Sequence, residues 1–171
     1  MARHGLGDTS TRWRSALAHR PAVQAALIQA IQLHQSGEGE AALNAYDEFL
    51  TKVAESESGT GAIVSTLATV HGNMGAIYMQ MAEYEKAKHS FTQALSLNPE
   101  DRLGHYNLAI LLTSKLNEHR KALKHARIAA KLDPENAAVL HLIANILQAL
   151  GAIDEANRYF SMAEIMAATS N

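Results

Sequence analysis

Apolar and polar positions recur along the chain with the period of an amphipathic helix. Ile77, Tyr78 and Met81 fall on one stripe, and Phe91 and Leu95 fall on a second stripe shortly after it. Apolar residues three and four positions apart form one face of an α-helix, whereas a half-buried strand would alternate at every second position. The pattern therefore predicts an all-α protein.

The helical pattern itself repeats along the chain. Three stretches, 71–99, 105–134 and 140–163, align with one another at a spacing of 34 or 35 residues. A period of this size is typical of two-helix units that stack into a solenoid. Small residues occupy matching positions in the three stretches: Gly75, Ala109 and Ala144; Ala87, Ala122 and Ala156; and Ala94, Ala129 and Ala163.

Two of these units end in nearly the same sequence, LNPED at 97–101 and LDPEN at 132–136. Pro99 and Pro134 disfavour helix at the preceding residue and suit the first turn of a new one. The middle unit has one extra residue between its two helices, near Lys115–Glu118. Each unit is thus expected to be a pair of helices joined by a short turn.

The second unit resembles the tetratricopeptide repeat family, whose pattern runs from a bulky residue through Leu-Gly, Tyr, Ala, an aromatic residue and Ala to Pro. The fourth unit keeps Ala144, Gly151, Ala156 and Phe160, whereas the third has Ala126 where an aromatic residue is usual. The residues of the second unit that carry the resemblance are His71, Met74, Gly75, Tyr78, Ala87, Phe91, Ala94 and Pro99.

The resemblance implies a right-handed α-α superhelix of about four helix pairs. A basic N-terminal extension is expected over residues 1–20 and the repeat array over 21–171. Between the first two repeats lies a polar, Gly-containing insertion at about 55–66, which is a solvated loop, a mobile clasp, or part of a lengthened helix pair that reaches a partner. The repeats are expected at about 23–56, 68–101, 102–136 and 137–170.

The resemblance also implies that the first helices of successive repeats line a concave groove that binds a peptide or helix of a protein partner. Asn73 and Asn107 match in position, and an Asn side chain can both donate to and accept from a peptide unit. Equally, these two side chains could only bridge helices within the stack. By register the groove presents Asn73, Ala76, Met79, Gln80, Tyr106, Asn107, Ile110, Thr113, His141, Leu142, Asn145 and Gln148.

One subtype of this family holds the terminal carboxylate of chaperone tails with a clamp of Lys, Asn and Arg. In this chain Leu27 and Ile31 stand at the Lys and Asn positions of the first helix, and Leu103 and Asn107 stand at the Lys and Arg positions of the third unit. Starting one repeat later gives Gly72 and Ala76, followed by Ala138 and Leu142. Only the Asn is retained in either frame. The sequence therefore disfavours such a clamp and favours a partner segment with apolar anchors.

Charge is close to balanced overall but uneven along the chain. Fifteen Lys and Arg against 17 Asp and Glu give a net charge of −2, which argues against holding nucleic acid by bulk charge alone. Residues 21–60 have one Lys against six acids, whereas 102–136 have seven Lys or Arg against three acids. One helix face in that basic segment is either solvated or binds an acidic partner, an anionic membrane or RNA, although no aromatic side chain there could stack on bases. Its residues are Arg120, Lys124, Arg127 and Lys131.

The sequence predicts no catalytic site, cofactor or metal centre. It has no cysteine, no Gly-rich phosphate loop and no H-E-x-x-H motif. His71 and His105 share one repeat position that usually holds a large packing residue, and neither has a second His three or four residues away. His119 and His125 would face different sides of one helix. We therefore expect a protein that is not an enzyme.

Apolar residues of the last helix have no following repeat to cover them, and exposed apolar ends mark interfaces. This predicts a second copy or another subunit at that end. The residues are Tyr159, Met162, Ile165 and Met166.

The most direct interpretation is an intracellular, most simply cytoplasmic, adaptor or assembly factor. No apolar run has the roughly 18–20 residues that span a bilayer. The Arg-rich N-terminus leaves organellar targeting as an alternative compartment. A structural subunit that uses the C-terminal end and the convex face is the alternative function, and RNA binding through the basic helix is less favoured.

Overall fold

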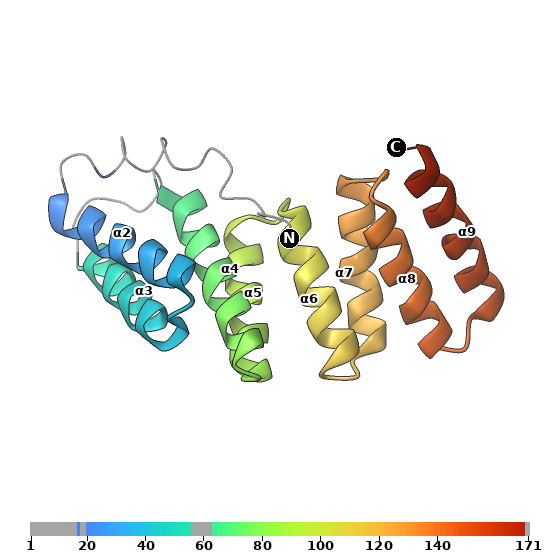
Figure 1. Cartoon of the computed structure of the whole chain (residues 1–171), viewed down its shortest axis with the longest axis horizontal. Helices are drawn as coiled ribbons and strands as arrows, with labels where there is room; N and C mark the ends of the chain where they lie inside the picture. The colour runs from blue at the N-terminus through green and yellow to red at the C-terminus, as the bar shows by residue number, and fades with distance from the viewer. Residues whose placement is uncertain (1–16, 18–19, 56–62, 170–171) are drawn as a thin grey trace.

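The computed structural model describes residue 17, residues 20–55 and residues 63–169 (Figure 1). Within these ranges the chain forms eight α-helices and no strand. The helices are α2 (Pro21–Ser36), α3 (Gly39–Ala54), α4 (Val64–Gln80), α5 (Tyr84–Leu97), α6 (Arg102–Ser114), α7 (His119–Leu132), α8 (Ala137–Ala149) and α9 (Ile153–Thr169).

The helices stand side by side in an elongated array that runs from α2 and α3 at one end to α9 at the other (Figure 1). Each helix packs on the next one in the chain, and α4 also contacts α6 while α6 contacts α8. The first helices of successive pairs therefore form a row of their own, as expected for a solenoid.

The turn inside each helix pair places one residue in the left-handed region of the backbone. These equivalent residues are Gly37 (φ 83°), Ala82 (φ 59°), Asn117 (φ 54°) and Gly151 (φ 78°). A left-handed residue reverses the chain after a helix, and glycine adopts this conformation without strain. The turn from α6 to α7 has four residues, 115–118, against three between α4 and α5, so the extra residue predicted there is present.

Two apolar clusters form the interior. The first joins α2, α3 and α4 around Tyr46 and Phe49, and the second extends from α5 to α9 and includes Phe91 and Ile143. The small residues Ala87, Ala122, Ala129 and Ala163 are fully buried, so the helices approach one another closely at the positions that repeat in the sequence.

The insertion between the first two pairs is shorter than the sequence indicated. Helix α4 begins at Val64, and Ile63 just before it is buried, so residues 64–66 belong to a helix rather than to a loop. Residues 56–62, and the N-terminal extension except Leu17 and Arg20, lie outside the described residues. Leu17 is fully buried in the first apolar cluster.

Candidate functional site

A hollow of about 700 Å³ opens between the first helices of the first three pairs. Helix α2 contributes Ile31, His34 and Gln35, and α3 and α5 contribute one aromatic ring each, Tyr46 and Phe91. The remaining lining residues come from α4, from the connection between α5 and α6, and from α6: Ala68, Thr69, Gly72, Asn73, Ala76, Gln80, Asn98, Asp101, Leu103, Gly104 and Asn107.

Four residues that the sequence placed in the groove line this hollow: Asn73, Ala76, Gln80 and Asn107. The others lie outside it. Three of these, Met79, Tyr106 and Leu142, pack instead against the second apolar cluster. The remaining predicted groove residues outside the hollow are Ile110, Thr113, His141, Asn145 and Gln148.

The two matching asparagines differ in their surroundings. Asn73 donates from Nδ2 to the Tyr46 hydroxyl oxygen at 3.1 Å, and His34 Nδ1 lies 3.3 Å from the same oxygen. Burial raises the pKa of Tyr46 and lowers that of His34, so both side chains are held neutral. Asn107 has no side-chain hydrogen bond to any described residue. Asn73 thus bridges α4 and α3, whereas the amide of Asn107 is available to a ligand.

Sequence reasoning missed two features of the hollow, Gly72 and Asp101. A Cβ built at Gly72 meets no described atom within 4 Å apart from the adjoining residues and backbone of α4, so this glycine leaves open space beside the helix. Asp101 accepts a hydrogen bond from the Leu103 backbone nitrogen at 3.1 Å and so caps the start of α6. The signal for Gly72 was a glycine inside a predicted helix, where glycine is unfavourable unless it serves packing or a site.

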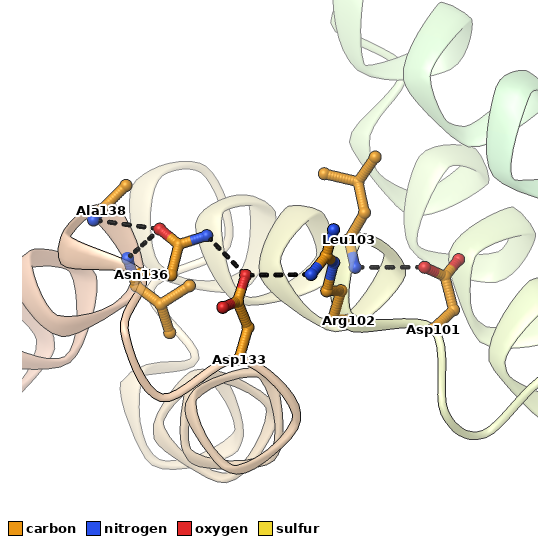
Figure 2. A network of polar contacts seen from close by, with 7 residues as sticks. Asp101, Arg102, Leu103, Asp133, Asn136 and Ala138 are labelled. Atoms are coloured by element: carbon orange, nitrogen blue, oxygen red, sulfur yellow. Dashed lines mark hydrogen bonds and ion pairs between the residues drawn. The ribbon is translucent and has the colours of Figure 1, made fainter. Parts of the chain in front are cut away.

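The connections before α6 and before α8 use similar residues in different ways (Figure 2). Asn136 caps α8 by accepting from the Ala138 nitrogen at 3.1 Å, and its own Nδ2 donates to Asp133 Oδ2 at 3.1 Å. Arg102 lies with Nη1 3.3 Å from the same Asp133 oxygen. The charge of Asp133 is therefore matched by Arg102, which extends from the start of α6 toward the second connection.

The predicted basic face on α7 is exposed, and one of its members is engaged. Arg127 Nη2 lies 2.8 Å from Glu155 Oε1, which links α7 to α9. Arg120, Lys124 and Lys131 are exposed to solvent. A surface ion pair of this kind contributes about 0–1 kcal/mol, so the face adds little to stability.

The C-terminal apolar residues are not equally uncovered. Met162 and Ile165 have 45% and 59% of their surface exposed. Tyr159 packs against the second apolar cluster, and Met166 is half-buried. Of the four residues predicted at this end, Met162 and Ile165 are thus the exposed ones, because Tyr159 packs against the preceding helices.

Two histidines twenty residues apart meet between α6 and α7. His105 Nε2 lies 3.0 Å from the Pro99 carbonyl oxygen, which can only accept, so this nitrogen carries the hydrogen when the ring is neutral. His105 Nδ1 then accepts from His125 Nδ1 at 2.9 Å. Burial, and secondarily the neighbouring His105, lower the pKa of His125. Among the described residues no three His, Asp or Glu side chains are grouped to hold a metal ion.

The free energy of unfolding is expected to fall as the pH drops below about 6.5, the ordinary pKa of histidine. The pKa values of His34, His71 and His125 are all lowered in the folded chain, so the unfolded chain takes up protons at higher pH. Urea unfolding of His125→Gln should show a smaller loss than wild type between about pH 7 and pH 5. An unchanged pH dependence in this variant would contradict the assignment.

Comparison with known proteins finds one match to a known repeat family. The sequence pattern of the tetratricopeptide repeat matches residues 68–101, the stretch that forms α4 and α5. This stretch of the chain is similar to a tetratricopeptide repeat. The predicted fold class, an all-α solenoid of helix pairs, is confirmed by the solved structures that this chain resembles.

A crystal structure of MamA superposes with a TM-score of 0.76 at 19% identity, covering 92% of this chain and 86% of that one. MamA from Desulfovibrio magneticus RS-1, from residue 41 to its end, superposes with a TM-score of 0.74 at 14% identity, covering 93% and 82%. At these identities the likeness establishes the fold alone. No curated protein matches the sequence significantly.

Tetratricopeptide repeats are in general modules that bind other proteins, and the match supports a role in protein–protein interaction for the present chain. The described part of the repeat protein contains no helix that is both long and apolar enough to cross a membrane.

Proposed function

We propose that this repeat protein is a non-catalytic adaptor or assembly factor that binds a peptide or helix of a protein partner in the hollow between α2, α4 and α6. The observation that carries the proposal is the open space beside Gly72, at the centre of a lining drawn from three successive repeats. The rings of Tyr46 and Phe91 also line this space.

The chemistry of the lining suits a protein segment. Ile31 and Leu103 offer apolar surface for an anchor, and Leu103 is exposed on α6. Gln35, Gln80 and Asn107 carry amide groups that can pair with backbone donors and acceptors. Each such hydrogen bond contributes about 0.5–1.5 kcal/mol, and micromolar affinity corresponds to about −8 kcal/mol, so binding at that level requires several hydrogen bonds together with more than one apolar anchor.

Gly72→Phe is expected to abolish partner binding while the protein stays folded. The new ring would occupy the hollow, because no described atom outside the adjoining residues and backbone of α4 stands within 4 Å of the Cβ position. Gly72→Ala is the matched control, since it changes the same position but leaves most of the space open. Affinity purification with mass spectrometry should recover one partner set with wild type and Gly72→Ala that is missing with Gly72→Phe.

The same experiment separates the second candidate function, a structural subunit that docks through α9. The observation that favours it is the exposure of Met162 and Ile165 on one surface. Partners that persist with Gly72→Phe but disappear with Met162→Asp would assign binding to α9 and contradict the groove proposal.

A further inference from the structure

Asp101 gives the hollow a charge that no other described lining residue cancels. Among the residues that the structure describes, no Lys or Arg lines the hollow. The two other titratable lining residues, His34 and Tyr46, are held neutral because burial lowers the pKa of the first and raises that of the second. The lining therefore carries one negative charge near neutral pH.

Capping of α6 does not require this charge. Asn136 occupies the equivalent position before α8 and accepts from the backbone nitrogen two residues later at 3.1 Å, the same distance as for Asp101. Asn and Asp are comparable caps in general. The residue at this repeat position thus caps the following helix in both connections. It is the uncharged Asn136 before α8, away from the hollow, and the carboxylate Asp101 before α6, beside the hollow.

Asp133, in the connection before α8, has its charge matched by a neighbouring cation, whereas Asp101, in the connection before α6, does not within the described part of the chain. Asp133 is paired with Arg102 and also accepts from Asn136 (Figure 2). Arg102 follows Asp101 directly in sequence, yet its guanidinium reaches the other connection. Asp101 itself forms no ion pair with any described residue. The nearest cation in sequence is therefore directed away from the hollow.

We infer that the hollow selects its partner through a cationic side chain, Lys or Arg, whose head group lies against the Asp101 carboxylate. The inference rests on the proposed function and names the chemistry of the segment bound there. A hydrogen bond between two ionised groups is roughly twice as strong as one between neutral groups, and partial enclosure strengthens it further. The partner class is thus opposite to the acidic tails held by carboxylate clamps.

The test begins with selection of binding sequences from a displayed library of random short peptides. The intact wild-type chain, Asp101→Asn, Asp133→Asn and Gly72→Phe are used as separate baits. Asp101→Asn keeps a capping side chain, as Asn136 demonstrates. Asp133→Asn is the matched control, because it removes one carboxylate from the equivalent connection without touching the hollow.

Wild type and Asp133→Asn should enrich peptides with Lys or Arg at one position, and Asp101→Asn should lose that preference. For one selected peptide, either Asp101→Asn or replacement of its cation by norleucine should weaken binding about tenfold. Both changes together should weaken it little further, because they remove the same contact.

Peptides that bind wild type, fail to bind Gly72→Phe, and carry no basic preference would overturn the inference but leave the groove proposal intact. Equal basic enrichment with Asp101→Asn would overturn it as well. Peptides that bind Gly72→Phe as well as wild type, or a library that yields no binding peptide at all, would contradict the groove proposal and the inference together.

Discussion

Replacing Phe91 with alanine is expected to lower the free energy of unfolding by about 3–5 kcal/mol, the usual loss for a buried aromatic side chain. The Phe91 ring is 1% exposed and belongs to the second apolar cluster. It also lies against α4 at Gly75. Its removal therefore leaves a cavity where α4 and α5 meet, which the backbones of two helices cannot readily close.

Urea unfolding followed by helical circular dichroism measures this loss. Phe160 is the matched control, because it holds the equivalent position in the fourth pair but is only partly buried. Phe160→Ala should therefore cost clearly less than Phe91→Ala. Equal losses at the two positions would mean that burial between repeats does not set the cost.

Gly75→Ala should destabilise the protein, whereas Gly72→Ala, one turn earlier on the same helix, should stabilise it. A Cβ at Gly75 would stand 2.8 Å from two carbons of the Phe91 ring, closer than non-bonded atoms can approach. Overpacking of this kind costs about 1–3 kcal/mol. At Gly72 nothing opposes the gain of about 0.5–1 kcal/mol that alanine brings to a helix interior.

The two variants can be compared directly, because both replace glycine with alanine in α4 and only the residues around the new methyl group differ. The free energies of unfolding should move in opposite directions from wild type. A gain at both positions would show that Phe91 shifts without cost, and the close approach of α4 and α5 would then not constrain residue 75.

The repeat architecture could be predicted from the sequence because small residues mark the positions at which helices pack closely. Gly75 and Ala87 stand where two helix axes come close, and small residues recur at those places with the period of the fold. Asn73 and Asn107 were placed on the inner helices by the same register, and both line the hollow. Local patterns and spacing are sufficient for such features.

Other features depend on contacts between residues far apart in the chain. Met79 and Tyr106 were predicted to line the groove, but their side chains pack against the second apolar cluster. The contact between His105 and His125 could not be predicted, because it depends on how far α6 and α7 are shifted along their axes relative to each other. The sequence also could not show that the Asp101 carboxylate lacks an ion pair with the described residues, because Arg102 follows it in sequence but pairs with Asp133 in the structure.

Helix α4 contributes to both apolar clusters, with Met74 and Ile77 in the first and Ala76 and Met79 packed against the second. A repeat gained or lost by recombination inside the α4–α5 pair would thus expose two interiors at once, whereas an exchange at the connection between pairs would preserve every hairpin. We therefore expect this protein to gain or lose whole helix pairs more readily at its C-terminal end than at the α4–α5 pair, which connects the two apolar clusters.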